Sequence, residues 1–157
     1  MEEPKVVHST FVVERSFPKP PETVFAAFAD PAKKRRWFAP GDQNTVEEFT
    51  MDFKEGGTER LKYILGETTP FPGTALINES LYQEIVPNKR IVTASTMKLG
   101  DHRISASQVT FELLHTAEGT DLICTHQGAF FEGADGPKIR EAGWQTLINN
   151  LGKELER

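Results

Sequence analysis

The chain has 157 residues, of which 38% are hydrophobic and 26% charged, and its formal net charge is −5. These values are typical of one globular domain with a buried core, and they disfavour a disordered chain or a basic nucleic-acid-binding surface. No apolar run approaches the roughly 20 residues that a membrane-spanning helix needs. The acidic N-terminus does not have the pattern of a secretory signal, so we expect a cytoplasmic protein.

The first elements are predicted to be one strand and two short helices. Residues 10–17 alternate between apolar and polar, as in a strand, and three prolines follow. Helical spacing then runs from Glu22 to Asp30-Pro31, which is expected to end the helix. A second short helix is expected over residues 33–38, stopped by Pro40-Gly41. Its basic residues, 33–36, are interpreted as a solvated helix end, with phosphate or partner binding as the alternative.

The middle of the chain is predicted to contain only strands and turns. Stretches of β-type alternation, separated by Gly, Pro, Asn and Asp turns, occur at residues 49–53, 61–65, 74–86, 91–97, 105–113 and 122–126. Their short connections predict antiparallel pairing, because parallel neighbours need long crossovers.

The C-terminal part returns to helical spacing. Its apolar stripe consists of Ile139, Gly143, Leu147, Leu151 and Leu155, with Trp144 and Ile148 beside it. The fold class is therefore α+β, in which this long helix covers one face of a curved antiparallel sheet. We also expect Val109, Phe111 and Leu113 to face the helix.

Several sequence phrases occur in the order found in a known family. They are Val24-Phe25-Ala26-Ala27-Phe28 with Asp30-Pro31, Arg36-Trp37-Phe38-Ala39-Pro40, Glu55-Gly56-Gly57, Glu84-Ile85-Val86-Pro87 with Arg90-Ile91-Val92, Gly119-Thr120-Asp121-Leu122 with Thr125-His126, and Gly143-Trp144-Gln145. In this order the chain resembles the heat-shock-protein-90 ATPase activator homologues of the START-like (SRPBCC, helix-grip) superfamily.

The resemblance implies a single START-like ligand-binding domain over residues 1–157, with a cavity between the sheet and the C-terminal helix. It implies no single activity, because carriers, enzymes, sensors and co-chaperone domains share this scaffold. It also supplies no shared catalytic motif.

Glu79 is the first candidate for chemistry. It interrupts an apolar strand face predicted from Ala75, Ile77, Leu81 and Ile85. A carboxylate facing an apolar cavity has a raised pKa and can act as a general acid or base. Alternatively, a bulge or the cavity mouth lets Glu79 reach water or a basic partner.

Other polar candidates are Ser95, Ser107 and His126. The two hydroxyls lie on the predicted inner faces of their strands and can orient a ligand, or they bond to neighbouring strands or water. His126 closes the last strand on the face of Cys124, and it is either functional or structural. Cys124 itself is interpreted as a buried core residue.

Aromatic residues are the second group of candidates. Trp37, Phe38, Phe53, Tyr63, Phe111 and Trp144 are expected in the pocket or in the plain core. The remaining histidines lack metal-ligand spacing, and no phosphate loop or dinucleotide fingerprint is present, so no metal and no cofactor are expected.

Three functions remain open from the sequence. The first is a small-molecule-binding domain that holds an apolar or amphipathic ligand between sheet and helix. The second is a cyclase- or hydratase-type enzyme that uses Glu79 or His126 as the acid–base group. The third is a chaperone-interacting, ATPase-activator-like module.

Overall fold

Seven strands form one antiparallel sheet in the computed structural model, which describes residues 3, 5–39 and 44–157. The elements are β1 (Val7–Phe17), α1 (Pro21–Ala29), α2 (Pro31–Phe38), β2 (Thr45–Met51), β3 (Thr58–Ile64), β4 (Ala75–Val86), β5 (Arg90–Leu99), β6 (His102–Thr116), β7 (Gly119–Phe130) and α3 (Pro137–Leu155). The strand order is β1-β7-β6-β5-β4-β3-β2. The predicted α+β fold class is confirmed, including the two short helices after the first strand.

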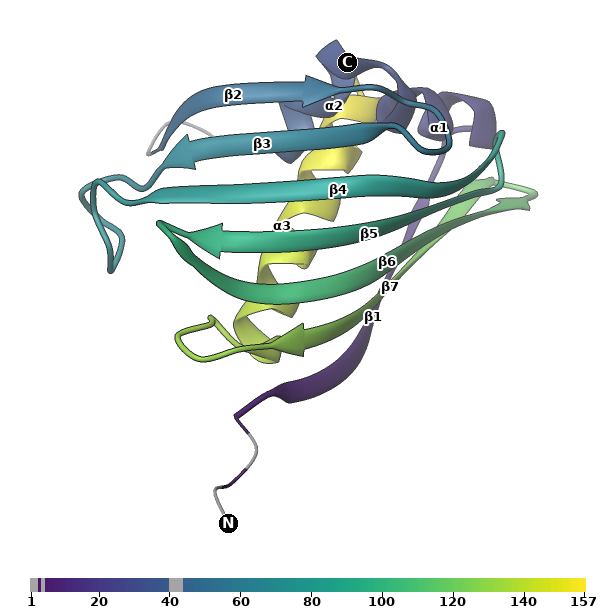
Figure 1. Cartoon of the computed structure of the whole chain (residues 1–157). Helices are drawn as coiled ribbons and strands as arrows, with labels where there is room; N and C mark the ends of the chain where they lie inside the picture. The colour runs from purple at the N-terminus through teal and green to yellow at the C-terminus, as the bar shows by residue number, and fades with distance from the viewer. Residues whose placement is uncertain (1–2, 4, 40–43) are drawn as a thin grey trace.

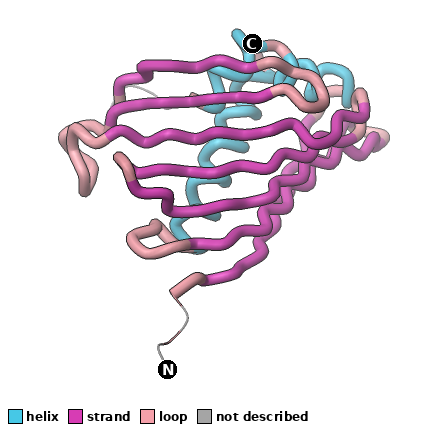
Figure 2. Tube along the Cα trace, viewed as in Figure 1, coloured by secondary structure: helices cyan, strands magenta, loops and turns pink. Residues whose placement is uncertain are grey.

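The helices lie on one face of the curved sheet (Figure 1). Helix α3 crosses this face, and α1 and α2 lie near the C-terminal end of α3, as the tube view also shows (Figure 2). None of the described helices is long and apolar enough to cross a membrane.

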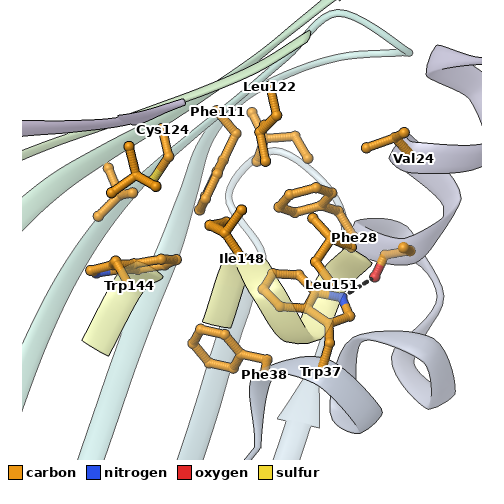
Figure 3. Packing of buried hydrophobic residues seen from close by; sticks show 14 of the residues in the cluster. Val24, Phe28, Trp37, Phe38, Phe111, Leu122, Cys124, Trp144, Ile148 and Leu151 are labelled. Atoms are coloured by element: carbon orange, nitrogen blue, oxygen red, sulfur yellow. Dashed lines mark hydrogen bonds between the residues drawn. The ribbon is translucent and has the colours of Figure 1, made fainter. Parts of the chain in front are cut away.

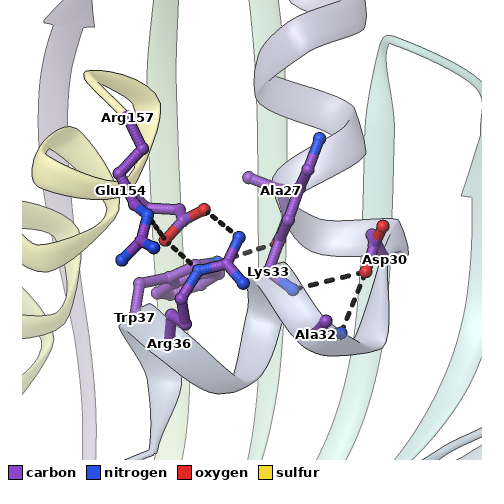
Figure 4. A network of polar contacts seen from close by, with 8 residues as sticks. All are labelled: Ala27, Asp30, Ala32, Lys33, Arg36, Trp37, Glu154 and Arg157. Carbon is purple, nitrogen blue, oxygen red and sulfur yellow. Dashed lines mark hydrogen bonds and ion pairs between the residues drawn. The ribbon is translucent and has the colours of Figure 1, made fainter.

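Asp30 separates the two short helices. Its backbone N–H bonds to the Ala26 carbonyl at the end of α1, and its side chain accepts from the backbone N–H groups of Ala32 and Lys33 (Figure 4). This cap, followed by Pro31 in the first turn, starts α2 two residues before the predicted Lys33. The predicted helix stop at Pro40-Gly41 lies outside the described residues.

The buried face of α3 differs from the predicted stripe. Its buried residues are Arg140, Trp144, Ile148, Leu151, Glu154 and Leu155, whereas Ile139 is 64% exposed. In the N-terminal half of α3, the buried residues lie one position later in the sequence than predicted. The large side chains of Trp144 and Ile148 point at the sheet there. The predicted stripe was therefore wrong at Ile139.

Aromatic and aliphatic side chains from all three helices and the sheet fill the core (Figure 3). Phe111 from β6 lies 4.9 Å from Phe28 and 5.6 Å from Trp144, measured between ring centroids. Val109, Phe111 and Leu113 are all buried, which confirms that this face of β6 packs against α3. Trp37 is fully buried and its indole N–H donates to the Ala27 carbonyl at 2.8 Å.

One ion pair lies inside this core. Lys34 of α2 is 4% exposed, and its Nζ lies 2.9 Å from Oε1 of Glu59 on β3. The Tyr82 hydroxyl donates to the same oxygen at 2.6 Å. The interpretation of residues 33–36 as a solvated helix end was therefore wrong at Lys34, because a carboxylate distant in sequence meets it.

A second ion pair joins α2 to the end of α3. Arg36 donates to both carboxylate oxygens of Glu154, at 2.8 and 2.7 Å, and Arg157 lies on the other side of that carboxylate (Figure 4). This bidentate contact holds the C-terminal end of α3 against the short helices.

Candidate ligand pocket

A pocket of about 410 Å³ lies between the first half of α3 and the middle of the sheet. Leu61 of β3, Leu76 of β4 and Met97 of β5 form one wall, and Ile139 and Leu147 of α3 lie opposite. The full lining comprises Phe38, Ala39, Leu61, Tyr63, Leu76, Asn78, Met97, Asp135, Ile139, Arg140, Gly143, Trp144, Thr146, Leu147 and Asn150.

Gly143 leaves the helix side of this pocket open. A Cβ atom built on Gly143 would meet no heavy atom within 4 Å, so a side chain there would have free space in front of it. Glycine in a helix interior costs roughly 1 kcal/mol against alanine. The first half of the predicted apolar stripe, Ile139, Gly143 and Leu147, thus lines the pocket, and Leu147 also packs against the core.

A small polar recess adjoins the pocket. It has a volume of about 30 Å³ and is lined by Asn78, Ser95, Thr96, Met97, Ser105, Ser107, Val109, His126, Arg140 and Trp144. Asn78, Met97, Arg140 and Trp144 line both spaces, so the recess is the inner end of the pocket.

Strand register explains why space remains there. Gly128 of β7 pairs with Ser107 of β6, Ser107 with Ser95 of β5, and Ser95 with Ser80 of β4. This row of small residues crosses four strands on the face turned to the helix, and the rows on either side contain larger side chains such as His126, Tyr82, Phe130 and Met97. Ser80 and Ser95 satisfy each other through a 2.7 Å hydrogen bond.

Arg140 closes the recess from the helix side. Its guanidinium makes two 2.8 Å hydrogen bonds to Asp135, donates to the Ser105 hydroxyl at 3.1 Å, and lies 5.1 Å from the ring centroid of Phe130. The Asp135 carboxylate therefore neutralises a cation that is only 8% exposed.

His126 and Ser107 have buried polar atoms without a partner. The His126 ring is 1% exposed and stacks on Phe11 at 4.6 Å. In the part of the chain that the structure describes, neither its Nδ1 nor the Ser107 Oγ has a hydrogen-bond partner. Burial, together with the charge of Arg140, lowers the pKa of His126 to about 4. The imidazole is thus neutral at neutral pH.

Six predicted candidates line these two spaces. Phe38, Tyr63 and Trp144 line the pocket, and Trp144 also lines the recess together with Ser95, Ser107 and His126. Burial and the charge of Asp135 raise the pKa of Tyr63 despite the opposing effect of Arg140.

Three predicted aromatic residues lie in the core away from this lining. Trp37 and Phe111 are buried beside Phe28, and Phe53 packs edge-on against Tyr82 at 5.1 Å. These three residues therefore follow the alternative expectation, which was packing in the core and not in the pocket. Phe38, by contrast, belongs both to the core and to the pocket lining.

Glu79 was placed on the wrong face. Its side chain is 46% exposed, and its Oε1 lies 2.9 Å from Nη1 of Arg60. This agrees with the alternative prediction, in which Glu79 meets a basic partner. A β-bulge between Tyr82 and Glu84 shifts the strand by one residue, so Ile85 points inward but Leu81 and Glu79 point outward. The inward residues of β4 before the bulge are Leu76, Asn78, Ser80 and Tyr82.

Sequence reasoning missed Arg140, Asp135 and Asn78. Arg140 precedes Trp144 by four residues, so both lie on the same face of the helix. A charged residue on the face that was expected to be buried could have identified Arg140 as a candidate. Asn78 was hidden by the same bulge that misplaced Glu79, and Asp135 precedes the helix in a loop.

Comparisons with known proteins agree over nearly the whole chain. Residues 18–156 match the family described as Activator of Hsp90 ATPase homolog 1-like protein. The solved structure of the Mll3558 protein from Rhizobium loti is 42% identical, covers 95% of this chain and 98% of its own, and superposes with a TM-score of 0.83. A putative uncharacterized protein from Rhizobium leguminosarum is 36% identical, covers 97% of each chain, and has a TM-score of 0.88.

More distant structures share the fold alone. The AHSA1-like protein from Aeromonas hydrophila is 18% identical, covers 94% of this chain and 92% of its own, and has a TM-score of 0.66. None of the curated proteins matches the chain.

Proposed function

The chain belongs to the family of Activator of Hsp90 ATPase homolog 1-like proteins, and from this premise we propose that it is a small-molecule-binding domain. The ligand is apolar or amphipathic and lies between α3 and strands β3–β5. Residues 1–157 act as one domain in this proposal, with the cytoplasm as the expected location.

The pocket beside α3 is the observation that carries the proposal. Small-molecule sites are concave and mostly apolar, with a few polar groups and volumes of roughly 300–1,000 Å³. The pocket of about 410 Å³ has Leu61, Leu76 and Met97 on one wall, and its inner end is a polar recess. A Cβ at Gly143 would meet no heavy atom within 4 Å, so the pocket is open on this side of the helix.

A fluorescent apolar probe tests this directly. N-phenyl-1-naphthylamine should bind the purified protein with increased fluorescence, and native mass spectrometry should reveal small molecules that co-purify. Gly143→Leu should place a side chain in the pocket and weaken probe binding by at least about tenfold, because a 1.4 kcal/mol loss is a factor of ten. The same change favours the helix by roughly 1 kcal/mol in propensity, so lost binding would not reflect unfolding.

Gln145→Leu is the matched control, since it adds the same side chain to an exposed position of α3. Its probe affinity should equal that of the wild type. Absence of probe binding to the wild type, or equal binding by Gly143→Leu, would overturn the proposal.

The geometry favours binding over acid–base catalysis. An enzyme of the cyclase or hydratase type needs a titrating group and a partner that converge on a substrate. Glu79 lies on the outer face, and Asp135, the carboxylate in the pocket lining, is bound by Arg140. His126 remains as a neutral imidazole at the inner end of the pocket.

A chaperone-activating role is the second candidate, and the family's description favours it. Stimulation of Hsp90 ATPase turnover by the purified chain would support it. Gly143→Leu should leave that stimulation unchanged, which separates the two functions.

A further inference from the structure

Two buried polar atoms belong to residues that line the polar recess. Among the described residues, no group forms a hydrogen bond with the buried Nδ1 of His126 or the buried Oγ of Ser107, and both residues line the recess. A Cβ built on Gly128 would lie 2.7 Å from Cε1 and 3.2 Å from Nδ1 of His126, so this ring edge leans over Gly128. Ser107 is the cross-strand partner of Gly128. The register therefore brings the two orphaned atoms to one place.

The recess is large enough for an oxygen group. A buried polar group without a partner costs about 1–3 kcal/mol, so native structures rarely leave two such atoms side by side. The recess, of about 30 Å³, exceeds the roughly 10–15 Å³ that a cavity needs to hold one water molecule, so an oxygen group has room there. One oxygen placed in the recess can bond to both atoms.

The charges around the recess favour an uncharged oxygen. Arg140 is neutralised by two hydrogen bonds to Asp135, and the His126 imidazole is neutral. Ser95 and Ser105, the other serines of the lining, already have partners in Ser80 and Arg140. A carboxylate head would enter without a free cation to pair with, and burying an unpaired charge is costly.

Resting on the proposed function, we infer that the ligand is an elongated apolar molecule with one uncharged oxygen group, a hydroxyl or a carbonyl, at its inner end. This oxygen lies in the recess and bonds to Nδ1 of His126 and Oγ of Ser107. The apolar body extends past Trp144 between Met97 and Leu147 to the open side at Gly143. A hydroxyl donates to one atom and accepts from the other, and a carbonyl oxygen accepts from both.

Displacement of N-phenyl-1-naphthylamine by 1-decanol and by decanoate tests the head group. The wild type should bind 1-decanol at least about tenfold more tightly than decanoate at neutral pH, because the carboxylate loses its hydration. Ser107→Ala and His126→Phe should each weaken 1-decanol binding by about three- to tenfold, the usual effect of one hydrogen bond. The affinity of each variant for the probe itself is measured first, so that its affinity for 1-decanol is calculated from its own probe affinity.

Ser16→Ala is the matched control, because the Ser16 hydroxyl bonds to Asp121 on the surface. It should leave the affinity for 1-decanol unchanged. In ¹⁵N spectra of the histidine rings, 1-decanol should shift the His126 nitrogens, while the probe should not. Circular dichroism and urea unfolding would verify that each variant is folded.

Two results would overturn the inference while leaving the proposed function intact. One is probe binding with equal 1-decanol affinity in wild type, Ser107→Ala and His126→Phe, which would mean that only water fills the recess. The other is tighter binding of decanoate than of 1-decanol. Failure of the probe to bind the wild type would instead refute the proposed function.

Discussion

Replacing Lys34 by methionine should destabilise the protein strongly, because the buried carboxylate of Glu59 would lose its positively charged partner. The Lys34 and Glu59 side chains are each 5% exposed, and Glu59 would keep only the Tyr82 hydroxyl as a partner. Breaking one side of a buried ion pair costs about 3–5 kcal/mol of unfolding free energy. Methionine preserves most of the packing of the lysine stem against Phe38, whose ring centroid lies 4.5 Å from Nζ.

The double variant Lys34→Met/Glu59→Gln separates charge from packing. Glutamine still accepts from the Tyr82 hydroxyl, so the double variant should be more stable than Lys34→Met, with a coupling energy of at least about 2 kcal/mol. Urea unfolding followed by far-UV circular dichroism measures all three variants. Lys54→Met is the control, since that side chain is 71% exposed and its loss should cost less than about 0.5 kcal/mol. A cost below about 1 kcal/mol for Lys34→Met, or strictly additive costs, would refute the buried pair.

The other predictions concern the recess and α3. His126, with a pKa of about 4 against 6.5 when unfolded, binds its proton less readily in the folded state. Stability should therefore be lost as pH falls from about 6.5 to about 4, by about 3 kcal/mol, and His126→Phe should remove this loss in urea unfolding across that range. Trp144→Ala should cost about 3–5 kcal/mol, whereas Ile139→Ala at an exposed position should cost under about 1 kcal/mol. Similar costs for the two in chemical unfolding would contradict the observed rotation of α3. Gly128→Ala should cost about 1–3 kcal/mol, because the new Cβ would lie 2.7 Å from the His126 ring. An unchanged midpoint of thermal unfolding would show that the ring edge does not lie over Gly128.

The order and type of the elements follow from local patterns that the sequence displays. Alternation along β6 predicted that Val109, Phe111 and Leu113 are buried, because side chains of a strand point to opposite faces in turn. Short turns predicted antiparallel pairing, and all seven strands pair in that way. Trp144 and His126 were recognised as candidates because the sequence pattern alone places a bulky or titratable side chain on the inner face of its element.

The tertiary structure alone decided features that depend on contacts between distant residues. A single bulge in β4 reversed the face of Glu79, since one extra residue changes the parity of every position before it. Lys34 is buried because Glu59, on a strand far along the chain, provides a compensating charge. Likewise, the recess exists because the register aligns Gly128, Ser107 and Ser95 across three strands. Local periodicity specifies how one element faces its neighbours, but register, bulges and helix rotation are set by packing between elements, and these determine where the candidate site lies.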